Sequence, residues 1–214
     1  MYKPILFNTE MVRAIIDGRK TATRRLIKPR YRDNEYSYSI CRRTLDNCIS
    51  HITYTDEDGV STRDMAPPYY VGDILYVKET WAKIPGASSE GGYAYKYKAS
   101  DEGEYWSGVN GFKWKPSIHM PKEAARIHLR VTEIRVEKLQ DISEEDAVKE
   151  GLYVGWHRTD QSSQAESARQ AFMWIWQSVT KNAQEVSWLA NPWVWVIYFE
   201  RCERRGKNDN KGSI

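Results

Sequence analysis

One short segment of the 214-residue chain concentrates side chains that can do acid–base chemistry. Residues 18–25 read Gly-Arg-Lys-Thr-Ala-Thr-Arg-Arg and directly follow a predicted helix. A lysine whose pKa is lowered by burial can act as a base, a threonine beside a base can act as a nucleophile, and arginines bind phosphates. In a straight strand Lys20 and Thr23 point to opposite faces, so one site can hold both only if the chain bends, which Gly18 permits. A basic surface turn is the simpler alternative.

A second candidate is Glu150, which ends a helix that Ser143 begins with a capping-box pattern. A carboxylate at a helix C-terminus lies unfavourably against the helix dipole, so it is either solvated or has another role. Residues 19–32 hold seven basic and no acidic residues, whereas residues 133–150 hold seven acids against three bases. The concentrated basic segment suggests an anionic ligand held locally, such as phosphate or nucleic acid. A solvated basic surface that pairs with the acidic segment is the alternative.

Aromatic residues alternate with lysines in a third segment. Tyrosine and tryptophan stack on nucleobases and lysine holds phosphates, so we assign Tyr93, Tyr95 and Trp106 to substrate binding. Spacing by two residues would place Tyr93, Tyr95 and Tyr97 on one face of a strand. Core packing in a β-rich insertion is the alternative. The full set is Tyr93, Tyr95, Tyr97, Tyr105, Trp106 and Trp114, with Lys96, Lys98, Lys113 and Lys115.

Composition excludes several classes of protein. The chain is 41% hydrophobic and 29% charged with a net charge of +3, as in an ordinary globular protein, and has no apolar run long enough to cross a membrane. Three cysteines are an odd count that argues against a disulfide scaffold and favours a cytoplasmic location. Cys41, Cys48 and His51 fall short of the paired-cysteine signature of zinc sites, so no metal or other cofactor is predicted.

The elements that must position these residues follow from hydrophobic spacing. A run that is apolar on both faces predicts a buried central strand over 193–199, and the phase of alternation slips near Thr132. The pattern predicts an α+β fold built around a small sheet or barrel. Helices are expected over 10–17, 143–151 and 168–179, and strands over 74–77, 127–136 and 193–199. Insertions are expected at about 26–70 and 83–115 in a single domain 1–203, and turn residues predict one hairpin in the first insertion. A disordered basic tail is expected at 204–214.

Together these segments resemble the ASCH family (activating-signal-cointegrator homology), in particular its longer members from bacteria and their phages. Gly18, Lys20, Thr23 and Arg25 match the family motif GxKxxTxR, and the later segments follow in the family's order over about residues 3–200. The resemblance implies a PUA-like β-barrel with flanking helices. Some small bacterial members hydrolyse N4-acetylcytidine to cytidine and acetate with a lysine, a threonine and a glutamate.

The resemblance implies that Lys20, Thr23 and Glu150 are the catalytic residues, and we add Arg24 and Arg25 as substrate-binding residues. The expected partner is a modified nucleoside or RNA, with no membrane, and the expected state is a monomer or weak homodimer. This chain is about twice as long as those small enzymes because of its insertions, so the resemblance supports the fold more strongly than the reaction. A non-catalytic module that binds RNA or a nucleotide, and a ribonuclease that uses the same cleft, are the alternatives.

Overall fold

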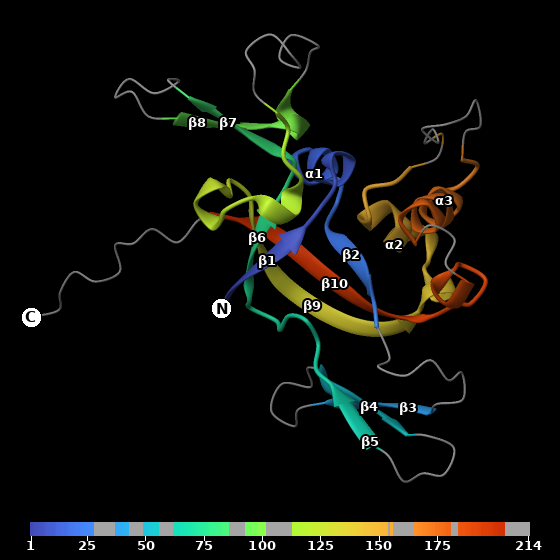
Figure 1. Ribbon diagram of the computed structural model, residues 1–214. Helices are drawn as coiled ribbons and strands as arrows, with labels where there is room; N and C mark the ends of the chain where they lie inside the picture. Colours follow the sequence, from blue (N-terminus) through green and yellow to red (C-terminus); the bar gives the residue numbers. More distant parts are fainter. Residues whose placement is uncertain are drawn as a thin grey trace, which may run out of the picture. The chain divides into compact units, whose positions relative to one another are not determined.

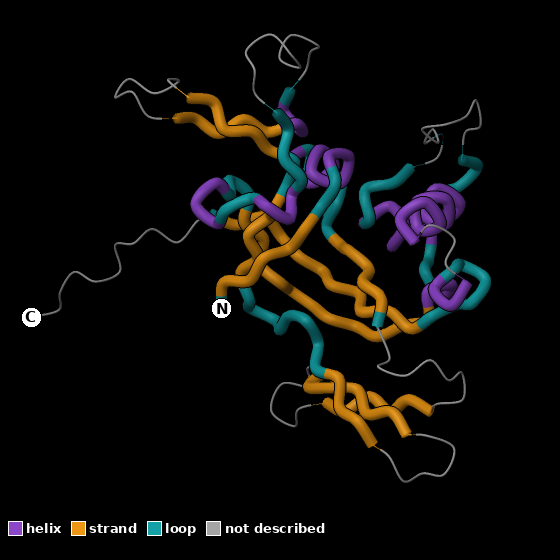
Figure 2. The backbone as a smooth tube through the Cα atoms, in the orientation of Figure 1, coloured by secondary structure: helices purple, strands orange, loops and turns teal. Residues whose placement is uncertain are grey.

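The computed structural model shows a mixed α+β protein (Figure 1; Figure 2). Its described residues divide into two compact units, and each is presented by itself. The first unit comprises Met1–Arg13, Asp73–Arg130 and Glu200–Ile214, and the second comprises Ala14–Gly72 and Val131–Phe199. No helix in the described part of the chain is long and apolar enough to cross a membrane. The structure describes residues 1–27, 37–42, 49–55, 62–85, 93–101, 113–153, 155, 165–180 and 184–203.

The first unit is built on parallel and antiparallel strand pairs. β1 (Tyr2–Leu6) pairs in parallel with β6 (Ile74–Lys78), and β6 pairs antiparallel with the first residues of β9 (His128–Lys138). β7 (Trp81–Pro85) and β8 (Tyr93–Tyr97) form a separate two-stranded antiparallel sheet. Short 3-10 turns cover Lys98–Ser100, Ser117–His119 and Lys122–Ala124, and two more in the second unit cover Leu139–Asp141 and Gln184–Val186.

The second unit contains the strand on which the motif lies. β2 (Ala22–Leu26) pairs antiparallel with β10 (Trp193–Cys202), and β10 lies between β2 and β9. The strand order of this sheet is β1-β6-β9-β10-β2, and it closes into no barrel among the described strands. Where the sequence predicts one hairpin, the structure has a second antiparallel sheet of β3 (Ser37–Arg42), β4 (Ile49–Thr55) and β5 (Thr62–Met65).

The three helices lie where the sequence predicts them, and their ends differ from the predicted ones by at most two residues. The Asn8 side chain accepts a hydrogen bond of 2.8 Å from the Met11 N–H at the start of α1 (Thr9–Ile16). Ser143 does the same for α2 (Glu144–Lys149), where its hydroxyl accepts from the Asp146 N–H at 3.1 Å. Both contacts are N-caps, which satisfy donors that lack a partner in the first helical turn. α3 (Ala168–Thr180) has the predicted amphipathic spacing.

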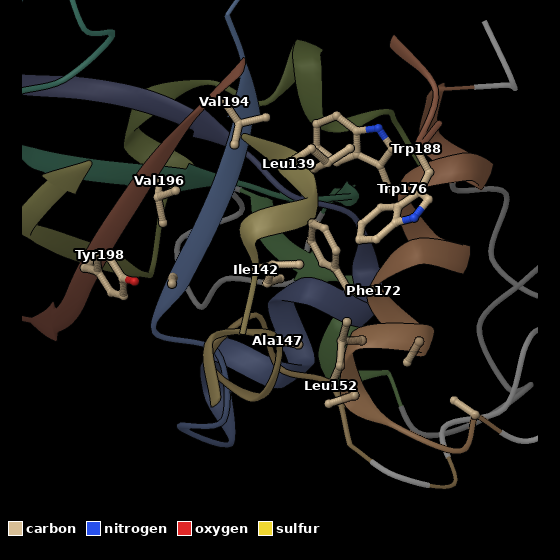
Figure 3. Close-up of a cluster of buried hydrophobic side chains, with 14 residues drawn as sticks. Leu139, Ile142, Ala147, Leu152, Phe172, Trp176, Trp188, Val194, Val196 and Tyr198 are labelled. Carbon is tan, nitrogen blue, oxygen red and sulfur yellow. The ribbon is translucent and has the colours of Figure 1, made fainter. Parts of the chain in front are cut away.

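A hydrophobic core fixes α2 and α3 in the second unit (Figure 3). Val194 and Val196 on β10 pack in one cluster with Phe172 and Trp176 on α3. The predicted burial of β10 on both faces is confirmed, since Val194–Phe199 are all buried. The slip of alternation in β9 is also confirmed. The cluster contains Ala22, Leu139, Ile142, Ala147, Leu152, Ala165, Ala168, Ala171, Phe172, Trp176, Trp188, Val194, Val196 and Tyr198.

Candidate functional site

The chain turns between the end of α1 and the start of β2. The helix ends at Ile16, and Gly18 follows with a φ of 76°, a left-handed conformation that glycine adopts without steric cost. The Lys20 N–H then donates to the Ala14 carbonyl at 2.9 Å. This contact anchors the lysine backbone to the last turns of α1.

The end of α2 lies against the same segment. Lys20 and Glu150 form an isolated antiparallel bridge, and the Thr21 N–H donates to the Lys149 carbonyl at 2.8 Å. Gly151 follows with a φ of 94°, and a Cβ at this position would lie 3.2 Å from the Lys20 Cβ. The backbone therefore brings together two residues that are 130 positions apart, and it leaves no room for a larger residue beside them.

Lys20 and Glu150 form a buried ion pair. Lys20 Nζ lies 2.5 Å from Glu150 Oε2, and the two side chains are 0% and 5% exposed. The ammonium also donates to the Ala22 carbonyl at 2.8 Å and to the Glu150 carbonyl at 3.1 Å. Three acceptors match the three N–H bonds of an ammonium, so the site satisfies every donor of a charged Lys20. Burial lowers the pKa of Lys20 below its usual 10.5, although the Glu150 carboxylate opposes this shift.

Arg24 is a second buried cation in the same cluster. Its guanidinium is fully buried and lies 3.4 Å from Glu150, 3.2 Å from Glu137 and 3.4 Å from Asp146. Glu150 therefore accepts from Lys20 on one carboxylate oxygen and from Arg24 on the other. The sequence predicts that Arg24 binds the substrate. In the structure its guanidinium instead contacts three carboxylates of the protein.

Asp146 links this cluster to Tyr198, which was not predicted as part of the site. The Tyr198 hydroxyl donates to Asp146 Oδ1 at 3.0 Å, and Lys149 Nζ lies 3.1 Å from the same oxygen. Burial raises the pKa of Asp146, but the hydrogen bonds from Lys149 and Tyr198 and the charge of Arg24 lower it more, so its pKa lies below 3.8. The sequence signal that could have identified Tyr198 is its hydroxyl in a strand predicted to be buried. A buried tyrosine hydroxyl usually has a hydrogen-bond partner.

Thr23 and Arg25 lie on β2 beyond the ion pair. Thr23 is 3% exposed, and Arg25 is half-buried. Because strand side chains alternate, these two residues project from the face of β2 opposite to Arg24. The charge of Arg25 nevertheless contributes to lowering the pKa of Lys20, and burial lowers the pKa of Arg25 itself. Lys20 and Arg24 thus each contact Glu150, and Arg25 lies within electrostatic range of the lysine. Thr23 lies on the face of β2 opposite to Arg24.

No family model, curated protein or solved structure matches this chain. Membership of the ASCH family therefore stays a prediction that depends on the motif and the order of segments.

The remaining predicted residues do not belong to this cluster. Tyr93 and Tyr95 lie on β8 in the first unit, and Trp106 lies outside the described residues. Cys41 and His51 are opposite each other in the β3–β4 register, whereas Cys48 lies outside the described residues. Within the described ranges, no group of three histidine, cysteine or acidic residues could hold a metal ion.

Tyr198→Phe removes only the hydroxyl that donates to Asp146. The folded-state pKa of Asp146 should rise toward its unfolded value of 3.8. A carboxyl with a lowered folded-state pKa stabilises the fold above its unfolded pKa, and this stabilisation is lost as the pH falls through the folded value. We expect the variant to lose about 1–2 kcal/mol of unfolding free energy at about pH 7. The loss should be smaller at about pH 2, because protonation of the carboxyl as the pH falls removes the charge that the hydroxyl stabilises.

Urea unfolding at the two pH values measures this difference. Tyr153→Phe is the matched control, because Tyr153 is 50% exposed, and it should change neither value. An equal loss for Tyr198→Phe at both pH values would contradict a role through the Asp146 carboxylate.

Proposed function

We propose that this chain is a metal-independent amidohydrolase that converts N4-acetylcytidine, or a related N4-acylated cytidine, to cytidine and the free acid. We also propose a PUA-like fold of the ASCH family. The observation that carries the reaction is the buried contact of 2.5 Å between Lys20 and Glu150. A lysine whose pKa is lowered beside a carboxylate, in a site that excludes water, is suited to proton transfer. The motif that holds Lys20 and Thr23 supports the substrate class.

The first proton transfer in this mechanism takes place within the pair. Lys20 passes a proton to Glu150 Oε2 across their hydrogen bond, which leaves a neutral amine and a neutral acid. Because Thr23 projects from the face of β2 opposite to Arg24, its side chain must turn toward Lys20 for this step. The amine then accepts the proton of the Thr23 hydroxyl as the threonine oxygen attacks the acyl carbon. Glu150 then protonates the exocyclic nitrogen as the C–N bond breaks and cytidine leaves. Water hydrolyses the acetyl-threonine ester to acetate, and the threonine hydroxyl is restored.

A variant of this mechanism assigns the attack to water. Glu150 is then the base that activates water, Thr23 positions that water, and Arg25 stabilises the oxyanion. Only the first route forms an acetyl ester on Thr23, which mass spectrometry of the quenched reaction would detect. In both routes the substrate must displace covering side chains, because Lys20, Thr23 and Glu150 are all buried.

The decisive assay incubates the purified full chain with N4-acetylcytidine and follows cytidine by chromatography. Thr23→Val should lower turnover by about 10²–10⁴-fold, because it removes the hydroxyl that both routes need. Thr21→Val is the matched control, since Thr21 lies in the same segment but is exposed, and it should retain wild-type turnover. Folded wild-type protein without turnover would refute the hydrolase and favour binding of RNA or a nucleotide at this site.

A further inference from the structure

The β7–β8 hairpin of the first unit gathers aromatic rings on one face. Its register pairs Trp81 with Tyr97 and Lys83 with Tyr95, and residues directly opposite each other share a face. Tyr93 belongs to the same face because strand residues alternate. The predicted alignment of the three tyrosines is therefore confirmed, and a tryptophan and a lysine join them.

These rings form a ladder with one end fixed in the core. The Tyr93 and Tyr95 rings lie 5.4 Å apart at 72°, and the Tyr95 and Trp81 rings lie 5.7 Å apart at 62°. Trp81 is buried in a cluster with Met120, whereas Tyr93 is 46% exposed at the other end. A hydrogen bond with Tyr93 raises the pKa of Tyr95 to about 12, so Tyr95 stays neutral at physiological pH. The ladder is thus a supported platform that ends in an accessible ring.

Lysines lie directly over the two ends of the ladder. Lys83 Nζ is 3.2 Å from the centre of the Tyr93 ring, and Lys115 Nζ is 5.1 Å from that of Trp81. The Lys115 N–H donates a hydrogen bond to the Trp81 carbonyl at 2.7 Å, which fixes the backbone of Lys115 beside Trp81. Both lysines are exposed.

Among the residues that the structure describes, acidic groups do little to offset the charge of these lysines. The described strands 81–85 and 93–97 carry two lysines and no acidic residue. Nearby Glu79 is buried and accepts both hydrogen bonds of a bidentate pair with Arg126, each 2.9 Å long. Glu123 is the acidic residue whose charge reaches Tyr95. The face therefore presents aromatic surface and positive charge together.

We propose that this aromatic–lysine face, made of Tyr93, Tyr95, Trp81, Lys83 and Lys115, binds single-stranded nucleic acid. An unpaired base can stack on the exposed part of Tyr93, and the lysines can hold the adjoining phosphates. A duplex offers its phosphates but keeps its base faces stacked, so it would engage only the lysines. This surface lies in the first unit and uses none of the residues of the proposed hydrolase.

Fluorescence anisotropy of a labelled oligonucleotide, titrated with the full chain, tests this proposal. The single strand should bind more tightly than a duplex of the same sequence. Tyr93→Ala should weaken binding of the single strand by about tenfold or more, since it removes the accessible ring. Lys83→Ala should weaken binding and lower the slope of log affinity against log salt by about one phosphate contact.

The control variants make the same two types of substitution, tyrosine to alanine and lysine to alanine, at positions in the second unit. Tyr153→Ala removes a tyrosine of similar exposure, and Lys138→Ala removes a lysine 4.7 Å from the centre of the Trp193 ring. Both should bind the single strand as wild type does, and so should Thr23→Val, which separates this surface from the hydrolase. Equal affinity for single strand and duplex, or unchanged binding by Tyr93→Ala, would overturn the proposal.

Discussion

Lys20→Met should lower the free energy of unfolding by about 3–5 kcal/mol and abolish turnover of N4-acetylcytidine, because it leaves Glu150 buried without its nearest cation. The lost contact is the 2.5 Å ion pair, whose side chains are 0% and 5% exposed, so solvent cannot replace the ammonium. Arg24, at 3.4 Å from the other carboxylate oxygen, compensates only in part. Urea unfolding gives the free energy, and chromatography of cytidine gives the turnover.

A double variant separates the structural role of the pair from its chemical role. Lys20→Met combined with Glu150→Gln removes both charges, so we expect it to be more stable than Lys20→Met alone by about 0.5–3 kcal/mol. Turnover should remain lost in the double variant, because neither proton carrier is present. Lys98→Met, at an exposed lysine, is the control and should change neither quantity. Wild-type stability of Lys20→Met would contradict a buried ion pair in solution.

Local patterns predicted the elements that hold the site. Asn8 and Ser143 are caps because their side-chain oxygens satisfy donors within three residues, and such contacts need no knowledge of the rest of the fold. The spacing of α3 and the apolar run of β10 are equally local signals. Residue type singled out Lys20 and Glu150 separately, and the resemblance to the ASCH family then implied a shared role for them.

The partners of Arg24 could not be predicted in the same way. Its three carboxylates come from positions 113, 122 and 126 residues away, and nothing in the spacing of residues 18–25 specifies which of many acids will meet it. The three-stranded sheet β3-β4-β5 was underpredicted because turn residues mark a hairpin but do not count the strands that pair.

The ion pairs of Lys20 and Arg24 change the interpretation of the basic and acidic segments seen in the sequence. The basic segment and the acidic helix do meet, but Lys20 and Arg24 are balanced there by Glu137, Asp146 and Glu150. Cations that are already paired contribute little to holding an anionic ligand. Attraction for phosphate must therefore come from other basic residues, such as the exposed lysines of the β7–β8 face.

Gly151→Ala should disturb the site through backbone strain and a steric clash together. Its φ of 94° strains any L-residue, at a cost of about 1–2 kcal/mol. The new Cβ would lie 2.8 Å from the Ala14 Cβ and 3.2 Å from the Lys20 Cβ, and such overpacking adds about 1–3 kcal/mol. We expect a total loss of about 2–5 kcal/mol in urea unfolding. Turnover should fall as well, because relief of the clash moves Lys20 away from Glu150.

Gly72→Ala isolates the steric part of this effect. Gly72 has a φ of 87° but nothing within 4 Å of its ideal Cβ, so its substitution brings the backbone strain without the clash. Gly151→Ala should therefore be the less stable of the two by about 1–3 kcal/mol. Adding Ala14→Gly to Gly151→Ala removes the closest contact and should restore turnover more than stability, because glycine weakens α1 by about 1 kcal/mol. Equal losses in the two alanine variants would mean that the end of α2 does not press on Lys20, and that the ion pair forms without this constraint.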